Sequence, residues 1–508
     1  MTMNNSRYTE VRNGSSPAVF SEIPVIDYDL FYDEVTSMLT DERYHCLSYS
    51  CHRTGEGLKF ICCIADDGSG DIRILSHVKK DDGTSLRSLT ASCYAMHIFE
   101  CEIHESHGVL FADHPWLKPV RYPHDRADRL SVMDNYPFYE MDSEELHEVG
   151  VGPIHAGVIE PGHFRFICNG ERVLHLEIQL GYQHRGIEKL FTDAGDSLRR
   201  SLLAEDIAGD SAVAHGLAHA QLAESLAGFE PPASLQAERC IAMELERIAV
   251  HIGDTAALCG DVAYQLGQVA CEALRTLVIN TTQYWCGNRF GKGLIRPGGS
   301  NFPLNEEIAG EILRIIKEVD RRFGNVTECV YTLPSVLGRF EDIGTVTRKQ
   351  ATTVGAVGMA ARTCGVPRDI RVTHPFQFYR QMEISPVMQE TGDVLARGML
   401  RALEVKESVK IIRRLIDSWK NCAKETGRPQ YDLKFRPDSL AVSVTEGWRG
   451  EICHVALTDN LGNLAMYKIK DPSMHNWMAL ALAVRSQEIS DFPVCNKSFN
   501  LSYCGNDL

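Results

Sequence analysis

Between residues 43 and 79 the chain alternates short apolar runs with Gly and Asp turns. The runs RYHCLSYSCH (43–52), GLKFICCIADD (57–67) and DIRILSHVK (71–79) have the length and the flanking residues of β-strands. The next segment, 85–108, predicts a strand or a helix pair that closes the unit. We therefore expect a small α+β domain over residues 18–121, preceded by a polar lead over 1–17.

Residues 122–148 show no steady hydrophobic period. The segment contains two prolines and many acidic residues. This composition is typical of a linker, or of an arm that lies across a partner.

From residue 149 onward the pattern predicts a second, larger domain that extends to residue 508. Short strands come first, and apolar residues then recur at spacings of three and four from about 186 to 425, which predicts long packed helices. Two alternating runs joined at a Gly-containing turn predict a β-hairpin over 450–473. A helix should follow, with Asp471 or Ser473 as its cap and Pro472 in its first turn. The expected fold class is α+β, with a mainly α-helical large domain that has short β elements.

Composition and charge narrow the function classes. The 508 residues have a globular composition and a net charge of -16. Residues 1–150 carry 13 Lys and Arg against 26 Asp and Glu, whereas residues 151–508 carry 39 against 42. An acidic chain without a basic stripe disfavours nucleic acid as a partner. The small net charge of residues 151–508 fits a subunit buried in a complex. Solvated, salt-bridged helices explain this small charge nearly as well.

Targeting signals and generic motifs are missing from the sequence. Every long apolar stretch is interrupted by a charge and the N-terminus lacks a signal-peptide pattern, so a cytosolic location is expected. The 17 cysteines are scattered without a C-x-x-C pair, which predicts reduced thiols and no zinc or iron–sulfur site. His104 and His107 share a helix face, but two imidazoles without a third ligand favour a polar surface. The nucleotide-binding and hydrolase motifs G-x-G-x-x-G, G-x-x-x-x-G-K-[ST], G-x-S-x-G and H-E-x-x-H do not occur.

Glu244, Arg247 and His251 lie at i, i+3 and i+7 along one predicted helix face. Such a row could conduct protons if it were buried. Spacing alone favours the simpler interpretation, a solvated charged face with one i,i+3 ion pair.

Several longer runs carry a family resemblance. Residues 152–190, GPIHAGVIEPGHFRFICNGERVLHLEIQLGYQHRGIEKL, resemble the opening of the large subunit of energy-converting, membrane-bound (group 4) nickel–iron hydrogenases and of the homologous quinone-site subunit of respiratory complex I. Residues 99–123 resemble the end of the small peripheral-arm subunit of complex I, here fused to the large one. Further matches are ELERIAVH (244–251), NRFGKGLIRPGG (288–299), EGWRGEICHVALTDN (446–460) and KIKDPS (468–473).

The resemblance also implies which positions would hold a nickel–iron centre. In the first cysteine motif, here EDIAGDSAVAH, the ligand positions are occupied by Ala208 and Ser211. The second motif aligns with NLSYCGNDL, which places Ser502 and Gly505 there, with Cys504 one residue away. Neither alanine nor a neutral hydroxyl replaces a bridging thiolate. We therefore expect no nickel–iron centre and no cofactor bound by this chain.

Other family positions suggest a pocket with proton-relay groups. Glu160 matches a hydrogenase glutamate that passes protons, Arg449 matches an arginine that overhangs the active site, and His215 ends the first cysteine motif. Ile159 and Leu217 occupy positions where the complex I relatives carry quinone-binding His and Tyr residues. A carboxylate in a cavity suits proton relay, and Arg449 could polarise a carbonyl or oppose Glu160.

By this resemblance the chain is expected to be a metal-free large subunit of a hydrogenase-related, complex I-like oxidoreductase complex. Its implied partners are a small iron–sulfur subunit, membrane-embedded ion-translocating subunits, and quinone or another small acceptor. It would lie peripherally on the cytoplasmic face of the inner membrane. Two alternatives remain: a structural coupling subunit without redox chemistry, and an active nickel–iron hydrogenase with unusual ligands.

Overall fold

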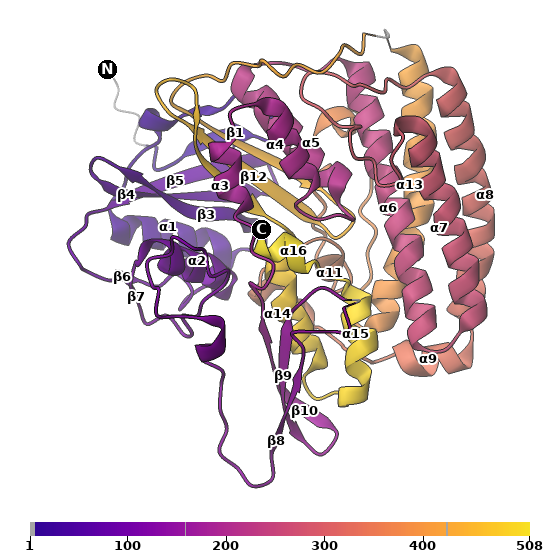
Figure 1. Cartoon of the computed structure of the whole chain (residues 1–508), viewed down its shortest axis with the longest axis horizontal. Coiled ribbons are helices and arrows are strands. Elements are labelled where there is room, and N and C mark those ends of the chain that lie inside the picture. The colour runs from indigo at the N-terminus through magenta and orange to yellow at the C-terminus, as the bar shows by residue number, and fades with distance from the viewer. Residues whose placement is uncertain (1–5, 158, 423–424) are drawn as a thin grey trace.

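The computed structural model describes residues 6–157, 159–422 and 425–508. Figure 1 shows an N-terminal sheet on one side, a bundle of long helices on the other, and a C-terminal sheet between them. This arrangement confirms the α+β class and the mainly helical second part. Within the described residues, no helix has both the length and the apolar character needed to cross a membrane.

The N-terminal unit is an antiparallel sheet with strand order β1-β5-β4-β3, packed against two helices. Three of its strands, β3, β4 and β5, confirm the sequence prediction. β1 falls within the segment expected as a polar lead, whose first five residues lie outside the described part of the chain. The elements of this unit are β1 (Thr9–Arg12), α1 (Tyr28–Thr40), β3 (Tyr44–Thr54), β4 (Gly57–Asp66), β5 (Asp71–Lys79), β6 (Leu86–Arg87), a 3-10 turn (Tyr94–Met96), α2 (His97–His107) and β7 (Phe111–Ala112).

The acidic segment that follows lies against this chain's own second sheet. That sheet has the order β10-β9-β8, and Figure 1 shows it projecting from the body. The Tyr139 amide donates to the Glu177 carboxylate on β10 at 2.7 Å, and the Gln179 amide donates to the Met133 carbonyl at 3.0 Å. The strands are β8 (His147–Val151), β9 (His163–Asn169) and β10 (Arg172–Gln179).

The helical part confirms the periodicity seen in the sequence. The long helices α6, α7, α8 and α13 pack side by side (Figure 1) around an apolar core that they share with the C-terminal sheet. The helices are α3 (Ile187–Asp193), α4 (Ser197–Glu205), α5 (Ala212–Ala227), α6 (Ala233–Asp261), α7 (Gln265–Cys286), α8 (Glu306–Val330), α9 (Pro334–Phe340), α10 (Arg348–Thr353), α11 (Gly358–Arg362), α12 (Ile370–Thr373) and α13 (Val394–Asn421).

The C-terminal sheet has the order β13-β12-β11-β2 and contains the predicted hairpin. Its edge strand β2 comes from the N-terminal end of the chain, so this sheet joins the two units. One detail of the prediction was wrong: Pro472 is the N-cap of α14 and lies before the first turn, while Asp471 accepts the Ser473 amide at 2.8 Å. The elements are β2 (Ala18–Val19), β11 (Ser439–Glu446), β12 (Glu451–Thr458), β13 (Leu464–Lys470), α14 (Ser473–Val484), α15 (Phe492–Phe499) and α16 (Tyr503–Asp507).

Candidate functional site

Arg449 lies on the turn between β11 and β12 and joins two distant segments. Its guanidinium forms two bonds to the Asp210 carboxylate, at 2.7 and 2.5 Å, and its Nε donates to the Asn500 carbonyl. It also stacks on the Trp448 ring at 4.0 Å. The group that opposes Arg449 is therefore Asp210, in the loop before α5, and no contact with Glu160 is seen in the described part of the chain.

His215 belongs to a buried row of hydrogen-bonded side chains. Its Nε2 lies 3.1 Å from the Asp471 carboxylate, and its Nδ1 lies 3.1 Å from His454 Nε2. His454 Nδ1 lies 2.8 Å from the Tyr467 hydroxyl, which lies 3.0 Å from His219 Nδ1. The row draws its members from α5, β12, β13 and the start of α14, and all of them are buried: Asp471, His215, His454, Tyr467 and His219.

Electrostatics shift the pKa values of two members of this row. Burial alone would raise the pKa of Asp471, but the hydrogen bond from His215 and the charge of Arg449 hold that pKa below its usual range. His454 stays neutral because burial lowers its pKa well below the ordinary value. With Asp471 ionised, the proton of the hydrogen bond between these two residues lies on His215 Nε2. A proton can pass along such a row by exchange of each hydrogen bond in turn.

Glu160 lies half-buried in the loop before β9 and faces the C-terminal segment. Its carboxylate lies near the Cys504 thiol, and burial together with this carboxylate raises the pKa of Cys504 to about 11. The Cys504 Sγ is in turn 3.5 Å from Ser502 Oγ. Glu160 is thus connected to the segment around Ser502 and not directly to Arg449.

The four expected metal-ligand positions offer only hydroxyl donors. Ala208 is fully buried, and Ser211 Oγ lies 3.3 Å from the Asp210 carboxylate. Ser502 Oγ accepts the Gly505 amide at 2.9 Å and so caps α16. A Cβ on Gly505 would lie 2.6 Å from Asp471 Oδ2, so Asp471 occupies the space that a cysteine at 505 would need. These residues do not fit a centre that requires thiolates.

The interpretation of Glu244, Arg247 and His251 as a solvated face was wrong, since all three are buried. Glu244 accepts from Arg371 at 3.0 Å and from the Tyr379 hydroxyl at 2.6 Å, and His251 Nε2 lies 2.6 Å from Glu404. This face of α6 packs against α13, and its hydrogen-bond partners come from α12, α13 and the β11–β12 turn.

The three residues belong to a larger buried charge cluster. Arg362 joins Glu446 at 2.7 Å and Glu404 at 2.5 Å. Burial and the nearby Asp369 raise the pKa of Glu446 to about 7. We define the cluster as Glu244, Arg247, His251, Arg362, Asp369, Arg371, Glu404 and Glu446. Because Glu446 ends β11 and Arg449 lies on the turn that follows, this cluster adjoins the site around Arg449.

Sequence reasoning missed five members of the site. His454 lay in a matched run and Tyr467 in the predicted hairpin, both without a role. Asp471 was treated only as a cap, and Asp210 and His219 were passed over. One signal was available in the sequence for His454: a polar residue inside a strand that is otherwise apolar on both faces. Of the two expected quinone positions, Ile159 is half exposed, whereas Leu217 is fully buried in the core.

Comparison with known proteins supports the expected relationship. Residues 261–436 match the family described as respiratory-chain NADH dehydrogenase, 49 Kd subunit. Hydrogenase-4 component G of Escherichia coli is 24% identical over 394 residues, which cover 78% of this chain and 67% of that protein. The carbon monoxide-induced hydrogenase of Rhodospirillum rubrum is 27% identical, over 70% of this chain and 97% of that protein. NADH-quinone oxidoreductase subunit 4 of Thermus thermophilus is 25% identical, over 68% of this chain and 90% of that protein.

Proposed function

On the premise that this chain is a relative of hydrogenase large subunits and of the 49 Kd subunit of respiratory-chain NADH dehydrogenase, we propose that it is the large subunit of a membrane-associated, complex I-like oxidoreductase complex. It forms the wall of a site next to the terminal iron–sulfur cluster of a small partner subunit. Electrons from that cluster reduce quinone or another small acceptor there, and proton uptake is coupled to ion translocation by membrane-embedded subunits.

The observation that carries this proposal is the buried row from Asp471 to Tyr467. The row begins beside Arg449, and the charge cluster around Glu244 and Arg247 adjoins the same turn. Buried ionisable groups are costly unless they are paired, and they gather where protons are handled. Glu160, next to Cys504, is the proton-accepting group nearer the surface.

The proposed subunit works without a nickel–iron centre. The two hydroxyls, one alanine and one glycine at the expected ligand positions lack the thiolates that such a centre needs. The complex is expected to hold iron only in the clusters of its partner, with no stoichiometric nickel and no hydrogen uptake.

A structural coupling role is the second candidate. It is favoured by the burial of Leu217, which leaves that position without a surface for a quinone head group. In this role the charge cluster would transmit a conformational change between α6 and α13 without redox chemistry.

Glu160→Gln distinguishes the two candidates. Glutamine keeps the shape of the side chain but does not exchange a proton, so coupled turnover of the purified complex should fall by about 100-fold. The matched control is Glu171→Gln, which makes the same change at an exposed position on the β9–β10 turn and should leave turnover unchanged. Both variants should assemble normally. Wild-type turnover in the Glu160 variant would leave structural coupling as the better explanation.

A further inference from the structure

Three side chains of the N-terminal unit converge outside the site described above. His97 and Cys101 lie one turn apart at the start of α2, and His114 comes from the loop after β7. Their ligand atoms all lie within 4.8 Å of one another, and Cys101 Sγ is 3.8 Å from His97 Nδ1. All three side chains are buried, with 1% of the His114 side chain exposed.

Two polar atoms of this group lack hydrogen-bond partners among the described residues. They are Nε2 of His97 and Nε2 of His114, and both are buried. Buried polar atoms are nearly always paired, so two orphaned imidazole nitrogens beside a thiol need an explanation. His114 Nδ1 accepts the Trp116 amide at 3.1 Å, so a metal would bind this ring through Nε2 and displace that hydrogen bond.

We propose that His97, Cys101 and His114 bind a zinc ion. Two imidazoles and a thiolate form a donor set that zinc prefers, and the S–N edge of a tetrahedral zinc site is about 3.5 Å, close to the separation present here. Binding releases the Cys101 thiol proton to solvent. The Glu100 carboxylate, 3.8 Å from His114 Nε2 and held by Ser88 and Thr90, supplies nearby negative charge.

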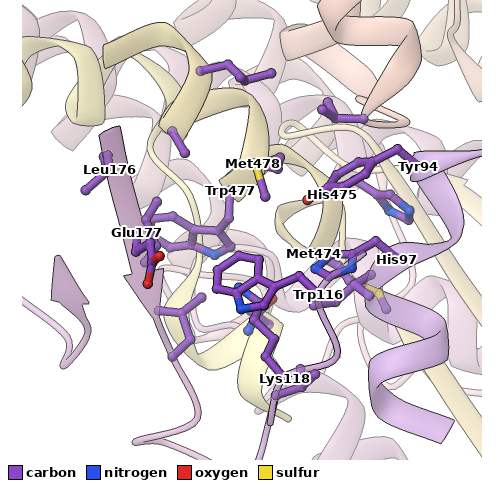
Figure 2. Close-up of a pocket in the computed structure, with 18 of the residues that line it drawn as sticks. Tyr94, His97, Trp116, Lys118, Leu176, Glu177, Met474, His475, Trp477 and Met478 are labelled. Atoms are coloured by element: carbon purple, nitrogen blue, oxygen red, sulfur yellow. The ribbon is translucent and has the colours of Figure 1, made fainter. Parts of the chain in front are cut away.

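The site adjoins a largely apolar cavity of about 100 Å³. Figure 2 shows His97, Trp116, Met474 and Trp477 among the side chains that line this cavity. Three protein ligands leave a fourth position for water. The ion would therefore fix α2 to the loop that carries Trp116, and with it one wall of the cavity.

Metal analysis of the full-length protein tests this site directly. After dialysis against excess zinc and removal of free metal, we expect one zinc per chain beyond any in partner subunits. Replacement by Co²⁺ should give a thiolate-to-cobalt absorption band, which Cys101→Ser abolishes. His97→Gln and His114→Gln should each weaken zinc binding by at least about 100-fold, because even the loss of an outer partner costs 10–100-fold. Cys51→Ser, at another buried thiol of the same unit, is the matched control and should keep both zinc and the band.

Measurements on the wild-type protein test the zinc site even if a variant does not fold. Absence of stoichiometric zinc together with absence of the cobalt–thiolate band would overturn the proposal. So would a band that survives in a folded Cys101→Ser protein, as judged by circular dichroism.

Discussion

Gly505 is closely enclosed by two polar side chains of the site. A Cβ there would lie 2.6 Å from Asp471 Oδ2 and 2.8 Å from Ser502 Oγ, so both side chains would have to move. Overpacking of this kind costs about 1–3 kcal/mol. We expect Gly505→Ala to lower the free energy of unfolding by that amount, as measured by urea denaturation.

The matched control for this prediction is Gly209→Ala in the loop before α5. No atom lies within 4 Å of a Cβ at that position, so the change should stay within about 0.5 kcal/mol. Equal stabilities of the two variants would show that Asp471 moves aside freely, which the hydrogen bond to His215 argues against.

At the scale of elements, Glu238 makes the packing of α6 sensitive to pH. It is 4% exposed and accepts from the Thr426 hydroxyl at 2.9 Å, and burial raises its pKa from 4.5 to about 7. The folded state therefore holds the proton more tightly than the unfolded chain does. The contribution of protonated Glu238 to the free energy of unfolding is fully present below pH 4.5 and is lost as the pH rises through 7. The loss amounts to about 3 kcal/mol.

Glu238→Gln should remove this pH dependence, because glutamine keeps an acceptor for Thr426 without a titrating group. Denaturant midpoints measured across that pH range provide the comparison. Glu328→Gln, on an exposed position of α8, makes the same change in charge and should keep the wild-type slope. A Glu238 variant with an unchanged slope would refute the assignment.

At the scale of the whole molecule, apolar side chains near Glu160 are left uncovered. Ile154 is 83% exposed and Ile159 is 48% exposed, next to the site that the small iron–sulfur subunit is proposed to face. Ile154→Asp should therefore lower the amount of that subunit that copurifies by about tenfold, the loss expected from one buried apolar anchor.

The control for this assembly prediction is Leu461→Asp. Leu461 is 84% exposed on the β12–β13 turn, so the substitution matches in exposure and charge. It should leave copurification intact. If both variants assemble normally, the partner does not cover Ile154.

The sequence alone determined the elements whose pattern is local. β3, β4, β5 and the β12–β13 hairpin follow from alternation between turn residues, and the long helices follow from their periodicity, because each pattern lies within one contiguous segment. The relationship to hydrogenase and complex I subunits also came from contiguous motifs. The same motifs identified the residues that occupy the expected nickel–iron ligand positions.

Only the tertiary structure decided how charged and polar side chains pair. Asp471 and His215 are 256 positions apart in the sequence, and His454 and His215 are 239 apart. No local spacing encodes such contacts. The face of α6 that carries Glu244 was assigned to solvent because its partners lie on other elements. His104 and His107 drew attention by their spacing, whereas the fold brings His114 to His97 and Cys101. Burial and long-range proximity depend on how elements pack, and for this reason they decided the chemistry of the site.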